Sequence, residues 1–152
     1  MKKYFILFII VFMAIFSCEK DDICIESTTP NLKIKFFNNE DREASKTLNI
    51  KFLWTENKDS ISEFSNKAVD SLLLPMNLME NHTTFIIEND IGIDTIKIDY
   101  DRKDVFVSRS CGYKVIYESM NVSKLTSNWI KALEINNSTI ENENDTHIHI
   151  FH

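Results

Sequence analysis

The sequence contains very little glycine and proline, with two residues of each among its 152 residues. The two glycines, Gly92 and Gly112, lie far apart, so the phosphate-binding motifs G-x-x-x-x-G-K and G-x-G-x-x-G cannot occur. Turns must rely on asparagine and aspartate, which tolerate left-handed backbone better than other residues with a side chain. Glycine-rich nucleotide-binding sites are therefore excluded.

Basic residues are fewer than acidic ones, since the chain has 17 Lys and Arg and 23 Asp and Glu, which gives a formal net charge of -6. Loss of residues 1–17 would remove Lys2 and Lys3 and no acidic residue, which leaves 15 minus 23, or -8. This balance disfavours binding of nucleic acid, and of anionic lipid through a basic patch. We therefore expect no nucleic-acid partner.

The motifs H-E-x-x-H, G-x-S-x-G and C-x-x-C, which mark common metal, hydrolase and redox sites, do not occur in the chain. Catalytic groups that meet only in the folded protein leave no such motif, so a hydrolase with a dispersed Ser-His-Asp or carboxylate-pair site stays an alternative. We expect no cofactor, and the sequence favours a protein that is not an enzyme.

An apolar run of thirteen residues, 4–16, follows Lys2 and Lys3 and is followed by Ser17 and Cys18. This order is typical of a secretion signal. A helix of this length spans about 20 Å, whereas the hydrocarbon core of a bilayer is about 30 Å thick. The run therefore predicts a signal peptide over residues 1–17.

The segment Ile15-Phe16-Ser17-Cys18 resembles the lipobox of bacterial lipoproteins, although Phe16 replaces the small residue usual there. The resemblance implies cleavage before Cys18 by signal peptidase II and attachment of diacylglycerol to its sulfur. Acyl chains such as palmitate would then anchor the protein, since each buried methylene contributes about 0.8 kcal/mol. The alternatives are secretion with a free Cys18, or an uncleaved tail.

The next residues, Lys20-Asp21-Asp22, resemble the lysine-plus-acidic signal that sends Bacteroidota lipoproteins to the outer face of the outer membrane. The alternative is a solvated, charged stem.

If Cys18 carries lipid, Cys24 and Cys111 remain as a pair in an oxidising compartment. We predict that they form a disulfide, with two buried free thiols as the alternative.

From Asp22 onward, apolar and polar residues alternate with a period of two, which is typical of strands with one buried face. Eight or nine short strands at roughly ten-residue spacing predict an all-β, antiparallel β-sandwich, with a small β-barrel as the alternative. We expect a lipidated stem at 18–30, a β-sandwich domain at 31–152 and a chain reversal at Asp101–Asp104. The predicted core comprises Ile34, Phe36, Ile50, Phe52, Leu73, Phe85, Ile96, Ile98, Val115, Tyr117, Leu133, Ile148 and Ile150, and we also expect Trp54 and Trp129 to be buried.

Five segments in fixed order resemble an uncharacterised family of small Bacteroidota lipoproteins, known only as a domain of unknown function. They are Asp22-Ile23-Cys24, Thr29-Pro30, the element Leu72–Pro75, Ser110–Tyr113 and Tyr117. The resemblance covers essentially the whole mature chain and implies a lipoprotein with paired Cys24 and Cys111. It implies no activity, ligand or catalytic residue.

Three Asp-Ser/Thr-apolar triplets look like the acceptor of Bacteroidota O-glycosylation, with Ser60, Ser71 and Thr95 as the acceptors. Ser60 is favoured because an accessible loop is where a sugar can be attached.

Near the end of the chain, His147 and His149 would lie on one outward strand face, where they could bind zinc or copper with an added carboxylate. The favoured interpretation is a plain polar face without metal.

These observations indicate a lipoprotein of the outer membrane, at the cell surface or, as the alternative, on the periplasmic face. It would act as a non-catalytic interaction or envelope module whose partners are the membrane, through the lipid, and an envelope protein or glycan. The alternatives are a metal-binding lipoprotein that uses His147 and His149, and a hydrolase with a dispersed site.

Overall fold

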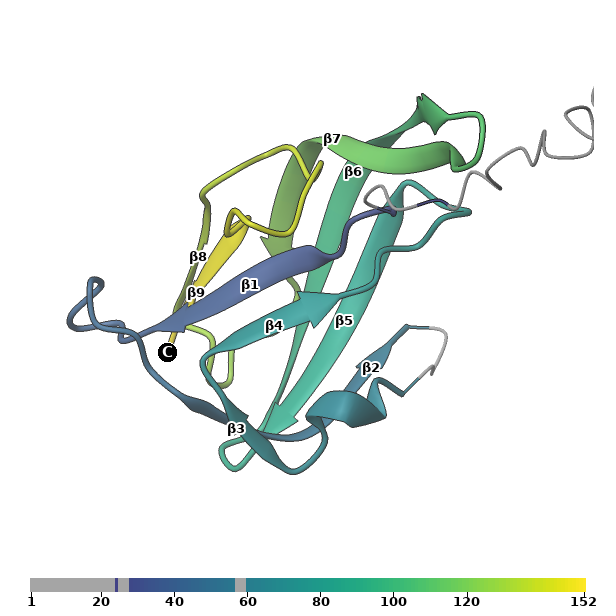
Figure 1. Ribbon diagram of the computed structural model, residues 1–152. Helices are drawn as coiled ribbons and strands as arrows, with labels where there is room; N and C mark the ends of the chain where they lie inside the picture. Colours follow the sequence, from purple (N-terminus) through teal and green to yellow (C-terminus); the bar gives the residue numbers. More distant parts are fainter. Residues whose placement is uncertain (1–23, 25–27, 57–59) are drawn as a thin grey trace, which may run out of the picture.

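The computed structural model describes Cys24 and residues 28–56 and 60–152. They form two packed β-sheets, one with strand order β4-β1-β9-β8 and one with order β3-β2-β5-β6-β7 (Figure 1). The strands are β1 (Leu32–Phe37), β2 (Leu48–Thr55), β3 (Lys67–Val69), β4 (Ser71–Leu74), β5 (His82–Asn89), β6 (Ile93–Ser108), β7 (Gly112–Lys124), β8 (Ala132–Ile135) and β9 (Ile148–Phe151). The predicted all-β sandwich is confirmed.

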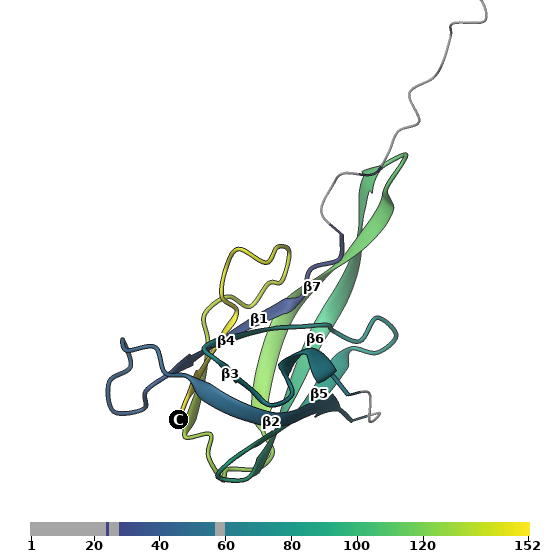
Figure 2. The same ribbon diagram turned by 60° about the horizontal axis from the view of Figure 1, so that its bottom comes forward.

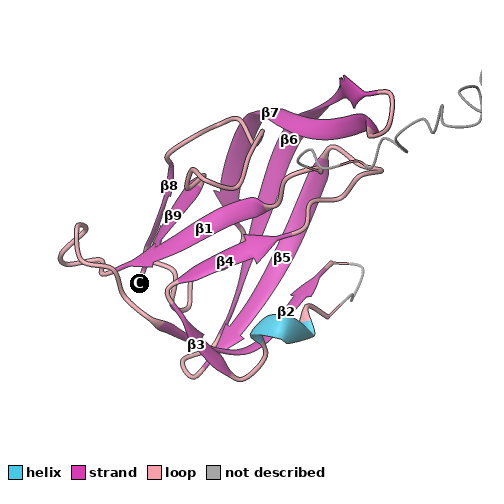
Figure 3. Cartoon of the chain, viewed as in Figure 1, coloured by secondary structure: helices cyan, strands magenta, loops and turns pink. Residues whose placement is uncertain are grey.

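Apart from the strands, the described chain contains the short 3-10 helix η1 (Ser62–Phe64), and the rest is loop (Figure 3). No helix within this part of the chain is long and apolar enough to cross a membrane. One pairing departs from the expected antiparallel arrangement, because β9 lies parallel to β1, with Ile34 opposite Ile148 and Phe36 opposite Ile150. The end of the chain therefore completes the sheet that β1 begins.

A single core fills the space between the sheets. Its largest fully buried side chains include Trp129, Tyr117, Phe36 and Phe85. Most of the predicted core residues are buried, and Val115 and Leu133 are partly buried against the core. The residues confirmed as buried are Ile34, Phe36, Ile50, Phe85, Ile96, Ile98, Tyr117, Trp129, Ile148 and Ile150. Trp54 is only partly buried.

Phe52 was expected in the core but is 50% exposed, whereas its neighbour Leu53 is completely buried. The cause is a register shift in β2 between Ile50 and Phe52, where β2 pairs with β5. One extra residue in a strand turns every later side chain to the opposite face of the sheet. The alternation therefore predicts the first half of β2 correctly and the second half wrongly.

Leu73 was also expected in the core but is 41% exposed. Three consecutive leucines carry no alternation, so their sequence does not show which of them point inward. In β4, Leu73 lies opposite the outward-facing Lys33, and this pairing turns Leu72 and Leu74 into the core. The chain changes sheets at Asp70, since β3 belongs to one sheet and β4 to the other.

The charged segment Asp101–Asp104 was expected to reverse the chain, but β6 continues through it to Ser108. β6 and β7 project beyond the body of the sandwich as a two-stranded ribbon (Figure 2). All four charged residues are exposed, although Arg102 and Lys103 lie opposite the buried Tyr117 and Ile116 of β7. The pairing of β6 with β7 shifts register between Asp99 and Asp101, where the facing part of β7 contains Ser119 with its φ of 55°. The ribbon leaves the sandwich beyond this shift, since Tyr117 still packs in the core.

Candidate functional site

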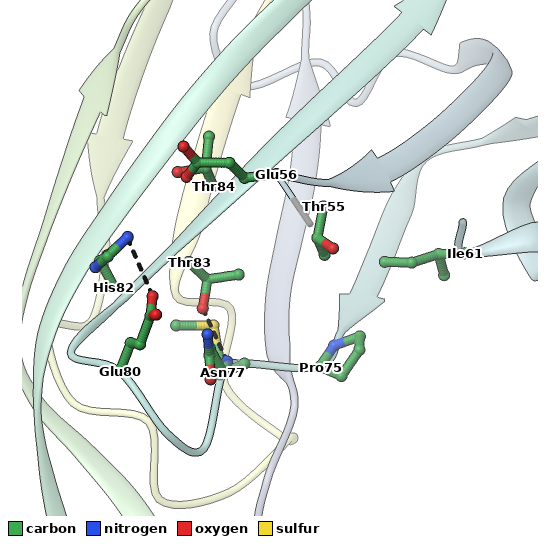
Figure 4. A pocket seen from close by; sticks show the side chains of 10 residues that line it. Thr55, Glu56, Ile61, Pro75, Asn77, Glu80, His82, Thr83 and Thr84 are labelled. Atoms are coloured by element: carbon green, nitrogen blue, oxygen red, sulfur yellow. Dashed lines mark hydrogen bonds and ion pairs between the residues drawn. The ribbon is translucent and has the colours of Figure 1, made fainter. Parts of the chain in front are cut away.

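A hollow of about 270 Å³ lies between the end of β2 and the segment that joins β4 to β5 (Figure 4). Its walls are formed by Thr55, Glu56 and Ile61, and by residues 75–77, 80 and 82–84. His82 Nε2 lies 3.4 Å from Glu80 Oε2, and Figure 4 shows this pair at one side of the hollow. The hollow is thus lined largely by polar side chains.

A closed hydrogen-bond ring holds the floor of this hollow. The Thr83 hydroxyl accepts a hydrogen bond from the main-chain N–H of Asn77 at 2.9 Å and lies 2.7 Å from the Tyr100 hydroxyl. The Tyr100 hydroxyl donates in turn to the Asn77 carbonyl at 2.9 Å. Burial raises the pKa of Tyr100, so this phenol stays protonated as a donor. Thr83 and Tyr100 thus fix the β4–β5 connection.

No serine or cysteine belongs to the lining of the hollow among the residues that the structure describes. Its hydroxyl side chains are those of Thr55, Thr83 and Thr84, and the Thr83 hydroxyl is buried and takes part in the hydrogen-bond ring. The carboxylate and imidazole of Glu80 and His82 therefore have no serine nucleophile to activate in this hollow. The dispersed serine hydrolase that the sequence left open gains no support here.

A second notable region is the end of the long ribbon, residues 106–114, which we call the hairpin tip. A disulfide joins Cys111 in this turn to Cys24 in the N-terminal segment, with the two Cα atoms 4.9 Å apart, and confirms the predicted pair. Phe106 and Tyr113 lie opposite one another on the two strands, with ring centroids 5.4 Å apart. They are 57% and 70% exposed. The hairpin tip thus presents two solvent-exposed aromatic rings.

A third region lies at the other end of β6 and consists of Ile91, Ile93 and Leu125, which we call the distal patch. Their exposed fractions are 72%, 44% and 57%. The main chain brings them to the same end of the molecule, since the Asn128 side chain donates to the Ile93 carbonyl and Leu125 N–H donates to the Thr95 carbonyl. Exposed apolar clusters of this kind are typical of contact surfaces.

The comparison with known families identifies the chain. Residues 47–152 match a protein family of unknown function, DUF6452. The chain belongs to this family. The matched range contains β2 to β9, the hollow, the hairpin tip and the distal patch, whereas β1 and Cys24 precede it. No curated protein and no solved structure matches the chain.

In this DUF6452 chain, His147 does not face outward as expected, because its side chain is completely buried. Its Nδ1 accepts a hydrogen bond from the main-chain N–H of Lys33, and the main-chain N–H of His147 donates to the Lys33 carbonyl, both at 2.9 Å. His147 therefore extends the ladder between β1 and β9 with its ring. A nitrogen used in this way is not available to a metal ion.

His149 is half-buried, and its ring centroid lies 4.7 Å from that of Phe37. Nowhere in residues 28–56 and 60–152, or at Cys24, do three His, Cys, Asp or Glu side chains come together as a metal site would require. The two histidines predicted to act together thus lie in different surroundings.

These surroundings predict how stability changes with pH. Burial lowers the pKa of His147, His149 and His152. Above the ordinary histidine value of 6.5, both folded and unfolded states are neutral, and the stability is fully present. Below it the unfolded chain binds protons that the folded chain does not, so the free energy of unfolding falls as the pH falls, by at most about 1.4 kcal/mol per pH unit for each proton.

Urea unfolding between about pH 7.5 and pH 5.5 measures this slope. His147→Gln should make the slope shallower, since one of the buried rings is then gone. An unchanged slope in this variant would contradict the role assigned to His147.

The three glycosylation acceptors differ in accessibility. Ser60 is exposed, whereas Ser71 is half-buried in β4 with its hydroxyl bonded to the Asp70 carboxylate at 2.9 Å. Thr95 is half-buried in β6 between β5 and β7. Accessibility therefore favours Ser60 among the three. The predicted lipidation residue Cys18 and the export signal Lys20, Asp21 and Asp22 lie outside the described residues.

Sequence reasoning missed two sets of residues. Asp94 was noted only as part of a glycosylation triplet, but it is completely buried and accepts four hydrogen bonds. A single aspartate at the start of a strand gives no signal of this role. Phe106 and Tyr113 were also missed, because the sequence places the chain reversal at Asp101–Asp104, whereas the turn lies at residues 109–111 and brings these two residues opposite one another.

Proposed function

We propose that this protein is an outer-membrane lipoprotein, anchored through lipid on Cys18 and displayed at the cell surface, where it acts as a non-catalytic interaction module of the envelope. The observation that carries the proposal is the Cys24–Cys111 disulfide. Disulfides persist in oxidising compartments outside the cytoplasm. The bridge lies directly behind the lipobox-like segment and the charged residues 20–22, as expected for an exported and tethered domain.

The distal patch supports the interaction role. β6 is 16 residues long, so its two ends are separated by about 50 Å at the usual rise of a strand. Ile91, Ile93 and Leu125 therefore lie far from Cys111 and from the segment that leads to the anchor. A partner protein of the envelope can reach apolar residues there without interference from the bilayer. Ser60, the most accessible acceptor, is the position where we expect any glycan.

Cells that express the protein with a photo-crosslinking residue test both halves of the proposal. We expect mass spectrometry to find diacylglycerol on Cys18, and protease added to intact cells to cleave the domain. A crosslinker at Ile91 should then trap a defined protein, and Leu125→Asp should abolish the product. Met79 is the matched control, since it is 83% exposed and apolar but lies outside the distal patch.

Two outcomes count against the proposal. An unmodified Cys18 with the leader attached would remove the lipid anchor. Equal trapping from positions 91 and 79, or trapping that Leu125→Asp does not change, would remove the distal patch as the partner surface.

A further inference from the structure

We propose that the hairpin tip lies against the same bilayer that holds the lipid of Cys18, and that Phe106 and Tyr113 enter its headgroup region. This inference rests on the proposed lipid anchor and goes beyond it, because it assigns a membrane-contact site within the folded domain. The partner of the hairpin tip is a lipid surface, and the body of the sandwich lies farther from that surface than the tip does.

Chain length supplies the first argument. Cys24 follows Cys18 by six residues, and a fully extended chain of that length reaches roughly 20 Å. The disulfide brings Cys111 to within 4.9 Å of Cys24 between Cα atoms. The turn of the hairpin is therefore confined to a short distance from the bilayer surface. The body of the sandwich has no comparable restraint.

Without the disulfide, this restraint would be much weaker. The next described contact of the N-terminal segment is at Thr29, whose hydroxyl accepts a hydrogen bond from Val115 N–H at 3.0 Å. Thr29 follows Cys18 by 11 residues, a reach of roughly 40 Å. The disulfide thus halves the tether, and it selects the projecting end of the β6–β7 ribbon, seen in Figure 2, as the end that faces the membrane.

The side chains at the hairpin tip provide the second argument. Phe106 and Tyr113 are five and two residues from Cys111, and their rings contact one another on the same face of the ribbon. Both are more than half exposed, although neither is needed by the core. Aromatic rings, tyrosine in particular, favour the headgroup region, where an apolar ring and a polar group can both be accommodated.

Charge provides the third argument. Residues 106–114 contain Arg109 and Lys114 and no acidic residue, in a chain whose net charge is -6. Arg109 is exposed in the turn, whereas Lys114 lies on the face of the ribbon opposite Tyr113, where its Nζ donates to the Glu141 carbonyl at 3.4 Å. The long basic side chain of Arg109 is suited to a bilayer surface, because its stem can lie along the acyl boundary while its charge meets phosphate. The hairpin tip is locally basic where the rest of the chain is acidic.

Brominated lipid tests the inference, because bromine quenches tryptophan emission only at short range. The complete acylated protein, as Phe106→Trp or as Ile91→Trp, is reconstituted into phosphatidylethanolamine and phosphatidylglycerol vesicles. The two sites are matched, since the original side chains are 57% and 72% exposed, and the unsubstituted protein gives the background of Trp54 and Trp129. We expect quenching of the added tryptophan by about half or more at 106 and background quenching at 91.

A third sample carries Phe106→Trp together with Cys24→Ser and Cys111→Ser, and we expect its quenching to fall by about twofold or more as the tether lengthens. Equal quenching at 106 and 91, or background quenching at both, overturns the inference. Flotation of the vesicles and the mass of Cys18 are scored separately. Protein that floats with an acylated Cys18 but shows no quenching at 106 overturns only the membrane contact, whereas protein without acyl chains overturns the proposed anchor and with it this inference.

Discussion

Asp94→Ala is expected to lower the free energy of unfolding by about 3 to 5 kcal/mol, one of the two largest effects for a change in this chain. The Asp94 side chain is completely buried. Its carboxylate accepts hydrogen bonds from the main-chain N–H groups of Asn128, Trp129 and Ile130 at 2.7 to 2.8 Å, and from the Thr126 hydroxyl at 2.9 Å. Loss of the carboxylate leaves buried donors without an acceptor.

The cost is large because two of the four donors, the main-chain N–H groups of Trp129 and Ile130, are buried away from water. Trp129 and Ile130 are 1% and 0% exposed, and Trp129 is among the largest side chains of the core. An unpaired buried donor costs about 1 to 3 kcal/mol. Asp94 therefore links the loop after β7 to the start of β6 and holds Trp129 in the core.

Urea unfolding followed by tryptophan emission measures the effect of Asp94→Ala. Asp99→Ala is the matched control, because Asp99 lies on the same strand and its carboxylate forms an ion pair with Lys97 at a partly exposed site. An exposed ion pair contributes less than about 1 kcal/mol. A loss for Asp94→Ala no larger than that for Asp99→Ala would contradict the role assigned to Asp94.

The same carboxylate has a consequence at acid pH. Burial favours the neutral form, but the hydrogen bonds from residues 126, 128, 129 and 130 together outweigh it and lower the pKa of Asp94 below 3.8. A lowered carboxylate pKa stabilises the fold above the unfolded value, and that stability is lost as the pH falls through the folded value. The contribution of Asp94 to stability is thus lost at a lower pH than that of the histidines.

Removal of the disulfide is expected to have the second large effect. Cys24→Ser with Cys111→Ser should lower the free energy of unfolding by about 4 to 5 kcal/mol on the loop-entropy account. The bridge closes a loop of 87 plus 1, or 88, residues in the unfolded chain. Because the effect lies in the unfolded chain, the dependence of the unfolding free energy on urea should also become steeper, as more surface is exposed on unfolding.

Equilibrium urea unfolding of the two proteins gives both quantities. Ser110→Ala is the matched control, since Ser110 is an exposed neighbour of Cys111 in the same turn and such surface changes are within about 0.5 kcal/mol. If the double serine variant unfolds at the same urea concentration as the parent, the disulfide does not constrain the unfolded chain, and this account is wrong.

The residues of β1 illustrate how much of the fold could be predicted. Leu32, Ile34 and Phe36 alternate with outward residues, and all three are buried as expected. The partnership of Cys24 and Cys111 followed from counting cysteines once Cys18 was assigned to lipid. Both inferences use local pattern or arithmetic, and neither requires knowledge of which strands are neighbours.

Phe52, Leu73 and His147 illustrate why the rest could not be predicted. The orientation of Phe52 depends on a register shift against β5, that of Leu73 on its position opposite Lys33, and the burial of His147 on a bond to β1. Each depends on a partner that is distant in the sequence. The candidate sites could not be predicted for the same reason. Asp94 meets the loop that it holds only on folding, and so do the two ends of the hairpin tip.

The amino-acid pattern alone was sufficient for the all-β class, the single cysteine pair and the expectation of export, because strand alternation and cysteine number are properties of short segments or of composition. The three-dimensional fold was needed to place an aromatic pair beside the disulfide and an apolar patch at the opposite end of β6. The physical reason is that strand register and sheet membership depend on contacts between residues far apart in the chain. The free energy of such contacts cannot be read from a local sequence pattern.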